Sequence, residues 1–328
     1  MHSVKRVRTS KEAQDARRRR EAVKIKDYRA LASTVAVARD RLDYSPDALE
    51  LTRKLLAQNP EHYTAWNYRR EILTRGIFQD LPTDDVQQTI DGELLFVFER
   101  LREFPKCYWL WNHRTWCLRS SPTPRWGQEL KLVTKMLEMD ARNFHGWQYR
   151  RYVVDNIQQT TGKSLVGAEF DYTTQKINAN FSNFSAWHNR SKLIPTLLAE
   201  SAGIDPRELL TKELALITQA IYTDPDDQSV WLYHRWLVTS DGIYAVPIDE
   251  RVAMLRKEIA SIAELYEVEP DSKWCIFSLA FYKELLADLT TAPPPPDVAD
   301  HVHQLLELDP MRARHYQAWL RKLEAKTA

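Results

Sequence analysis

Lys106 is the residue whose type and position most suggest chemistry. It follows Pro105 and opens a short segment that also contains Tyr108 and His113. A lysine ammonium is a compact point charge, and at the rigid edge of a loop it could neutralise a diphosphate. Most lysines are exposed and solvated, so the local sequence alone leaves an ordinary surface lysine as the alternative.

The segment around Lys106 belongs to an internal repeat. Five copies pair a tryptophan with an arginine, three residues later in four copies and four residues later in the fifth. The pairs are Trp66 with Arg69, Trp111 with Arg114, Trp147 with Arg150, Trp187 with Arg190, and Trp231 with Arg235. Each interval between tryptophans fits two antiparallel helices and two short loops. One such hairpin cannot bury its apolar stripe alone, so the hairpins must stack. The sequence therefore predicts an all-α fold, a curved right-handed α–α superhelical solenoid of helical hairpins.

The repeated tryptophan and arginine are most simply interpreted as scaffold. Residues three or four apart share one face of a helix, where the indole can pack between adjacent hairpins. The guanidinium can reach carboxylates or the carbonyls at the end of a neighbouring helix. Function is then expected where one copy differs from the others. Five positions before the tryptophan the copies carry Glu61, Lys106, Arg142, Ser182 and Asp226, so Lys106 is the only lysine there.

The repeats suggest three parts in one continuous solenoid. Residues 1–45 form a basic N-terminal arm and a first helix, and residues 46–240 hold the five repeats. Residues 241–328 hold a degenerate sixth repeat, around Trp274, and C-terminal capping helices that include Trp319.

Composition excludes several classes of protein. The chain has 328 residues, of which 8 are glycine and 11 tryptophan, which favours helices over a turn-rich β fold. No apolar run is long enough to span a bilayer, and the N-terminus lacks the apolar core of a signal peptide. The three cysteines, Cys107, Cys117 and Cys275, show no paired spacing. The sequence therefore predicts neither disulfides nor a zinc site, and reduced thiols fit a cytoplasmic protein.

The net charge of +1 hides an asymmetry. Residues 1–26 contain ten basic and three acidic residues, whereas the rest of the chain is slightly acidic. A basic arm of this kind can bind nucleic acid or serve in nuclear import, and the alternative is a solvated start of a helix.

The repeat unit, Asn/Asp-Pro-x-x-Tyr-x-x-Trp-x-x-Arg in five variants, resembles the α-subunit repeat of protein prenyltransferases over roughly residues 45–238. Other stretches resemble the type II branch of that family, the Rab geranylgeranyltransferases, in its short fungal form. They are Met1-His2 with Thr9-Ser10, the segment from Asp227 to Trp236, and Lys273-Trp274-Cys275 with the segment from Leu308 to Arg312.

The resemblance implies a crescent-shaped α subunit around an α–α barrel β subunit that holds the catalytic zinc and the prenyl pocket. Lys106 matches the family's diphosphate-contacting lysine, which stabilises the leaving group electrostatically. Tyr108, Asn143 and His145 match positions that line the mouth of the active site. Phe144 stands where farnesyltransferase α subunits have a tyrosine, so a hydroxyl contact to the diphosphate is lost. Cys107 replaces the usual asparagine and receives no role.

The implied substrates are geranylgeranyl diphosphate and Rab GTPases with C-terminal cysteine pairs, which an escort protein presents. The acidic surface of helices such as residues 93–103 is a candidate site for the escort protein, with a solvated face as the alternative. His2 could reach the zinc of the β subunit as an accessory ligand, or it could be a terminal histidine without a role.

Two other functions remain open from the sequence. One is the α subunit shared by farnesyltransferase and geranylgeranyltransferase I, and the other is a non-enzymatic helical scaffold whose basic arm binds nucleic acid. In the preferred interpretation, neither nucleic acid nor a membrane is a binding partner.

Overall fold

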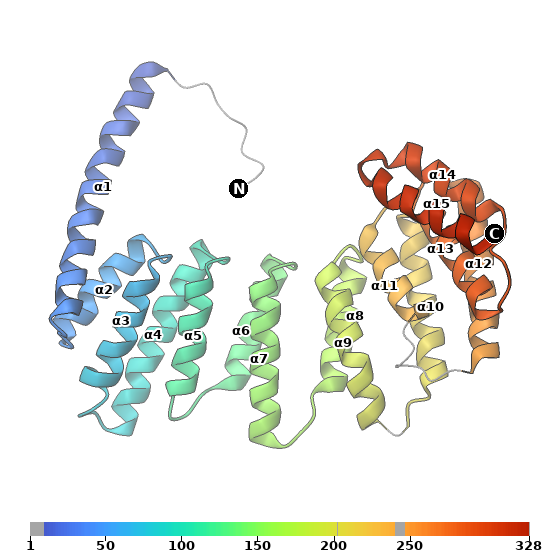
Figure 1. Cartoon of the computed structure of the whole chain (residues 1–328). Helices are drawn as coiled ribbons and strands as arrows, with labels where there is room; N and C mark the ends of the chain where they lie inside the picture. Colours follow the sequence, from blue (N-terminus) through green and yellow to red (C-terminus); the bar gives the residue numbers. More distant parts are fainter. Residues whose placement is uncertain (1–9, 202, 240–246, 328) are drawn as a thin grey trace. The chain divides into compact units, whose positions relative to one another are not determined.

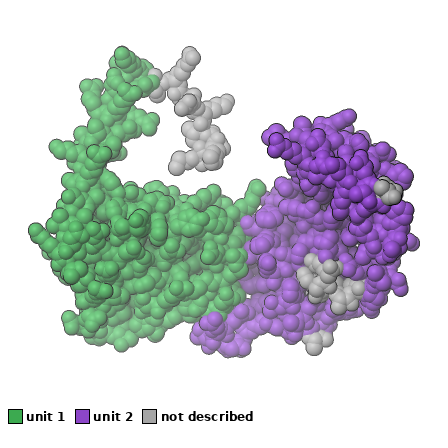
Figure 2. Space-filling view, in the orientation of Figure 1, with its two compact units in different colours: residues 1–157 green, residues 158–328 purple. Residues whose placement is uncertain are grey.

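The computed structural model describes residues 10–201, 203–239 and 247–327, and this part of the chain forms α-helices without any strand (Figure 1). The predicted all-α class is confirmed. The chain divides into two compact units, residues 1–157 and 158–328 (Figure 2). The first unit begins with α1 (Lys11–Asp40), α2 (Pro46–Gln58), α3 (Tyr63–Ile72) and α4 (Thr83–Glu103). It continues with α5 (Tyr108–Ser120), α6 (Trp126–Met139) and most of α7 (Phe144–Thr161).

The second unit has the same hairpin construction. Its helices are α8 (Val166–Ala179), α9 (Phe184–Glu200), α10 (Pro206–Thr223), α11 (Gln228–Thr239), α12 (Ile248–Val268), α13 (Lys273–Leu289), α14 (Asp297–Leu308) and α15 (Ala313–Thr327). The segment predicted to be a degenerate sixth repeat, around Trp274, contains α12 and α13, and its assignment as a repeat stays a prediction. A C-terminal core around Val302, Leu305 and Tyr316 joins α13, α14 and α15.

The repeat tryptophans are buried, and each closes the loop that precedes its helix. In each of the five repeats the indole N–H donates to the carbonyl oxygen of the residue six positions earlier. The pairs are Trp66 with Pro60 (2.8 Å), Trp111 with Pro105 (2.9 Å), Trp147 with Ala141 (2.9 Å), Trp187 with Phe181 (2.6 Å) and Trp231 with Pro225 (2.7 Å). The tryptophan therefore fixes the shape of the loop as well as filling the core.

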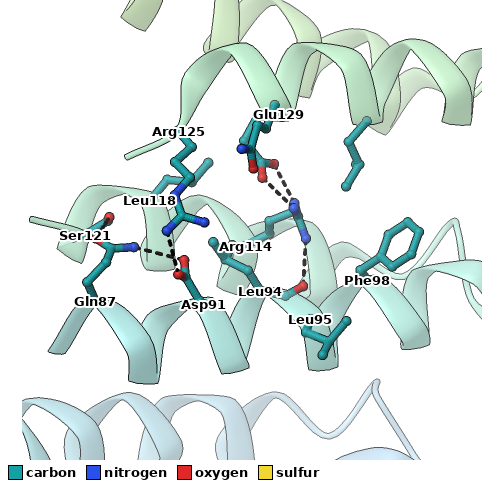
Figure 3. A pocket seen from close by; sticks show the side chains of 12 residues that line it. Gln87, Asp91, Leu94, Leu95, Phe98, Arg114, Leu118, Ser121, Arg125 and Glu129 are labelled. Carbon is teal, nitrogen blue, oxygen red and sulfur yellow. Dashed lines mark hydrogen bonds and ion pairs between the residues drawn. The ribbon is translucent and has the colours of Figure 1, made fainter. Parts of the chain in front are cut away.

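Buried carboxylates connect one repeat to the next. Three repeat arginines make two hydrogen bonds each to a glutamate on the first helix of the following repeat, and each also donates to a backbone carbonyl. The pairs are Arg69 with Glu93, Arg114 with Glu129 and Arg190 with Glu213. Figure 3 shows Arg114 held between the Glu129 carboxylate and the Leu94 carbonyl. Such bidentate pairs fix both the distance and the orientation of neighbouring hairpins.

Glu93 is one of these buried carboxylates, and this corrects the expectation that residues 93–103 form one acidic surface. Only 5% of Glu93 is exposed, and its carboxylate binds Arg69 and His113. It cannot contact an escort protein in this structure.

The fifth repeat departs from the predicted pattern. Arg235 follows Trp231 by four residues instead of three, and it lies half-buried over the rings of Phe277 and Phe281. His234, three residues after the tryptophan, takes the inward position and lies 2.9 Å from a carboxylate oxygen of Glu258. Because the residue three positions after the tryptophan points inward at helical spacing, His234 takes the place that the arginine has in the other repeats. Arg235, one residue later, therefore points in a different direction.

Gly76 follows the helix of Trp66 at a place where a glycine commonly ends a helix, and the structure gives it a different role. It lies in a π-helical turn, Leu73–Ile77, that continues α3. A Cβ atom on Gly76 would lie 2.2 Å from the carbonyl oxygen of Tyr44. The turn therefore requires glycine because another backbone segment passes so close.

We expect Gly76→Ala to lower the free energy of unfolding by about 1–3 kcal/mol, the usual cost of forcing extra atoms into a packed site. Gly92→Ala is the matched control, because Gly92 lies within α4 and a Cβ there meets nothing within 4 Å. The control should be neutral or stabilising by roughly 0.5–1 kcal/mol. Urea unfolding of both variants checks this, and equal midpoints would contradict it.

Candidate functional site

Lys106 lies in the loop between α4 and α5, and its charged group is accessible. Its side chain is 73% exposed, and Nζ lies 3.6 Å from Oδ2 of Asp140. This distance exceeds that of a hydrogen bond, and exposed ion pairs of this kind are weak. The ammonium group can therefore turn toward an incoming anion at little cost.

Asn143 holds the Lys106 loop beside the next repeat. Its side-chain amide donates to the carbonyl oxygen of Pro105 at 3.1 Å. Its Oδ1 accepts from the backbone N–H groups of His145 (3.0 Å) and Gly146 (3.3 Å) at the start of α7. Since Asn143 is buried, these bonds are shielded from water and should fix the two loops together.

His145 is buried next to the Lys106 loop. It is 3% exposed, and its ring lies 4.3 Å from the Tyr108 ring and 3.9 Å from the Phe144 ring, measured between centroids. Burial lowers the pKa of His145, although a hydrogen bond with the backbone of Lys106 opposes this. The imidazole is therefore neutral near pH 7. The positive charge at this site comes from Lys106.

Two exposed aromatic side chains contact the ring of His145. Tyr108 and Phe144 are 56% and 53% exposed, and their rings lie 5.8 Å apart. Tyr63 at the start of α3 and Trp109 in α5 form a second aromatic pair, with ring centroids 5.3 Å apart. A cation beside exposed aromatic rings suits an amphiphile that carries a phosphate group and a hydrocarbon chain.

The structure thus brings together the four site residues suggested by the sequence, which are Lys106, Tyr108, Asn143 and His145. Sequence reasoning did not find Asp140, the counter-ion of Lys106. Asp140 directly follows α6, and only the stacking of two repeats places it beside a lysine 34 positions earlier. The one sign of this pair in the sequence is that Asp140 and Lys106 both lie in the loop before a repeat tryptophan.

The described residues contain no group of three or more His, Cys, Asp or Glu side chains that could hold a metal ion. His2, the suggested accessory zinc ligand, lies outside the described residues. Within the described part of the chain, no helix is long and apolar enough to cross a membrane.

Comparison with known proteins identifies the repeats. The family described as "Protein prenyltransferase alpha subunit repeat" matches this chain five times, at residues 45–76, 90–121, 126–157, 166–197 and 210–241. These ranges coincide with the hairpins that the tryptophans close.

Similar proteins extend over nearly the whole chain. The chain is 43% identical to "Geranylgeranyl transferase type-2 subunit alpha" of Schizosaccharomyces pombe, over 98% of each protein. It is 39% identical to the protein of the same name from Saccharomyces cerevisiae, over 96% of this chain and 98% of that one. The Homo sapiens protein of that name is 39% identical over 73% of this chain but only 42% of its own length.

A solved structure shares the fold. It is described as "Candida albicans protein geranylgeranyltransferase-I complexed with GGPP" and matches with a TM-score of 0.68, over 91% of each chain, at 19% identity. That likeness concerns the fold alone, whereas the sequence identities above carry the closer relationship. The chain belongs to the family of protein prenyltransferase α subunits, and the two fungal relatives described above, which it matches over 98% of their length, carry the name geranylgeranyl transferase type-2 subunit alpha.

Proposed function

We propose that this chain is the α subunit of a heterodimeric Rab geranylgeranyltransferase. The enzyme transfers the geranylgeranyl group from its diphosphate to the C-terminal cysteines of Rab GTPases and is active only with a β subunit. The observation that carries this proposal is the 36–43% identity to three fungal type-2 α subunits over 96–98% of this chain.

In this reaction a cysteine thiolate forms a bond to the first carbon of the prenyl chain while the bond from that carbon to the diphosphate oxygen breaks. Negative charge then develops on the leaving diphosphate. The exposed ammonium of Lys106 is suited to stabilise that charge, and a preorganised cation acts most strongly where charge develops. Tyr108 can add a hydroxyl donor, while Asn143 and the neutral His145 position the loop.

The family implies a zinc ion, which would bind and activate the attacking thiolate. The described residues do not offer a ligand set for it, so the proposal assigns the zinc to the β subunit. The residues of this chain bind the diphosphate, stabilise its charge and position the loops around it. His2 remains a proposed accessory ligand.

The further proposed partners are an escort protein that presents the Rab GTPase, and the proposed location is the cytoplasm. Three free, buried cysteines are consistent with a reducing compartment. The alternative, the α subunit shared by farnesyltransferase and geranylgeranyltransferase I, is less well supported because the full-length relatives carry the type-2 name.

Co-expression with the type-2 β subunit of the same organism tests the proposal. We expect a stable heterodimer that transfers geranylgeranyl to an escort-bound Rab protein, and we expect the isolated chain to be inactive. A heterodimer that instead prenylates a peptide with a single cysteine four residues from its end would support the shared α subunit. Failure to bind any prenyltransferase β subunit would contradict both.

A further inference from the structure

Most of the N-terminal half of α1 is exposed in the described structure. The helix buries Val35 and Ala38 near its C-terminal end, whereas residues 17–27 are exposed. It crosses the rest of the unit at Tyr28, whose hydroxyl oxygen accepts a 2.8 Å hydrogen bond from the Asn59 side chain. Beyond that point the helix projects away from the body of the unit (Figures 1 and 2). Helices this polar are seldom stable without a partner on one face.

The face of α1 that packs on the body continues outward as a row of cations. Counting back from Val35 at helical spacing leads through Leu31, Tyr28, Lys24 and Arg20 to Arg17. The direction of this face is fixed by an open hollow of about 650 Å³ where α1 leaves the body. From α1 the hollow is lined by Lys24, Ile25, Asp27 and Tyr28, and from the end of α2 by Gln58 and Asn59. We call Arg17, Arg20 and Lys24 the cationic face.

The charges of this face are only partly compensated. Arg17 pairs with Glu21 within the helix at 2.6 Å. Lys24 also interacts electrostatically with Glu21 without forming a close ion pair. Among the described residues, Arg20 has no ion pair. Residues 11–29 contain eight basic and four acidic side chains in total, so the projecting half of α1 carries a positive field.

The cationic face lies next to the edge of the first unit at which the Lys106 loop is found. Asn59 belongs to the loop between α2 and α3, and the next residue, Pro60, accepts a 3.4 Å contact from the Cys107 thiol in the loop between α4 and α5. Pro105 of that second loop accepts in turn from Asn143. The three loops therefore form one row, and α1 crosses the row at its first member.

We propose that the cationic face of α1 docks an acidic surface of the catalytic partner subunit. This rests on the proposed function: a protein that covers the Lys106 edge meets the projecting half of α1 next. An anionic membrane is a poorer fit, because the exposed Val23 and Ile25 lie on different sides of the helix and give no apolar stripe to insert. The row of arginine and lysine side chains matches carboxylates instead.

The test compares two triple variants that remove equal charge from the same helix. Arg17→Gln/Arg20→Gln/Lys24→Gln neutralises the cationic face, and Arg18→Gln/Arg19→Gln/Lys26→Gln neutralises the other faces. Association of each full-length chain with the purified β subunit is measured by stopped flow over a series of salt concentrations. Electrostatic steering changes association rates by roughly 10–10³-fold. We expect about a tenfold slower association at low salt, with a flatter salt dependence, for the first variant and little change for the second.

The other outcomes are distinguishable. If the unmodified chain forms no active heterodimer, the proposed function fails and the docking proposal falls with it. If the heterodimer is active but the two variants associate equally fast, only the docking proposal is overturned. Two further results would also overturn it. One is binding to phosphatidylserine vesicles that only the first variant loses, with unchanged association with the β subunit. The other is self-association of the isolated chain that only the first variant abolishes.

Discussion

Replacing Lys106 with alanine is expected to slow prenyl transfer by roughly 10²–10³-fold, which corresponds to about 3–4 kcal/mol of lost transition-state stabilisation. Lys106 supplies the positive charge of the site, since burial keeps the neighbouring His145 neutral. The leaving diphosphate gains negative charge as its bond breaks, so the rate should fall more than ground-state binding does. Single-turnover kinetics on the reconstituted heterodimer measures the chemical step directly.

Three controls sharpen this experiment. Lys106→Arg should restore only part of the rate, because a planar guanidinium does not occupy the place of a compact ammonium. Arg142→Ala removes an exposed cation at the equivalent position of the next repeat and should affect the rate far less. Asp140→Asn removes the weak counter-ion and should change the rate only a few-fold. Equal losses for Lys106→Ala and Arg142→Ala would indicate general electrostatics, and an unchanged rate in Lys106→Ala would remove Lys106 from the mechanism.

The heterodimer should still assemble in Lys106→Ala. The side chain is 73% exposed and makes one weak ion pair, and surface changes of this kind usually shift stability by about 0.5 kcal/mol or less. Size-exclusion chromatography with the β subunit checks that a slow variant is a correctly assembled one.

The helical hairpins could be predicted because their signal is local. A tryptophan recurs at one place in each hairpin, and the loop before it contains a proline or asparagine that interrupts the helix. The hydrogen bond from each indole to the carbonyl six residues earlier shows why the spacing is so regular. Both partners lie within one loop and one helical turn, so a short stretch of sequence contains both groups of the hydrogen bond.

Contacts between repeats could not be predicted from the local sequence in the same way. The arginine of one repeat could be expected to bind a carboxylate, but the sequence offers several glutamates at similar distances. Glu93 lies 24 residues after Arg69, whereas Glu129 lies 15 residues after Arg114. Which carboxylate turns inward depends on the crossing of adjacent helices. For the same reason, the sequence did not predict that Asp140 lies beside Lys106. Nor did it predict that His234 takes the inward place expected for an arginine.

The burial of His145 illustrates this limit at the candidate site. Its sequence neighbours, Phe144 and Gly146, do not reveal that its ring lies beneath Tyr108 of the preceding repeat. The match to a family position suggested a role at the mouth of the site, but only the packing shows that the imidazole is neutral and positions other groups.

Glu93→Gln is expected to lower the free energy of unfolding at neutral pH by about 3–5 kcal/mol, the usual result of removing one partner from a buried ion pair. The Glu93 carboxylate accepts two hydrogen bonds from Arg69, at 2.7 and 2.5 Å, and one of its oxygens lies 3.0 Å from Nε2 of His113. Glutamine keeps one acceptor oxygen and replaces the other with an NH2 donor that would face a guanidinium N–H. The two-oxygen pairing would be lost, and Arg69 would remain buried without a negative charge to balance it. Glu99→Gln, an exposed change on the same helix, is the matched control.

The same variant should also alter how stability depends on pH. Burial alone would raise the pKa of Glu93, but hydrogen bonds from His113 and Arg69 hold it at about 2, below its usual value of 4.5. As the pH falls, the unfolded chain therefore takes up this proton first. Stability that is fully present above about pH 4.5 is lost as the pH falls toward about 2, and the shift corresponds to roughly 3 kcal/mol.

Burial also lowers the pKa of His113, so protonation of the unfolded chain at this histidine destabilises the fold in the same direction from about pH 6.5 downward. Glu93→Gln should remove the carboxylate contribution and leave a flatter profile between about pH 5 and pH 3. Urea unfolding followed by tryptophan fluorescence at each pH measures this, with Glu99→Gln expected to follow the unmodified chain. If Glu93→Gln were as stable as that control at neutral pH, the buried carboxylate would not hold the first two repeats together. The pairs of Arg114 with Glu129 and of Arg190 with Glu213 would then need another explanation as well.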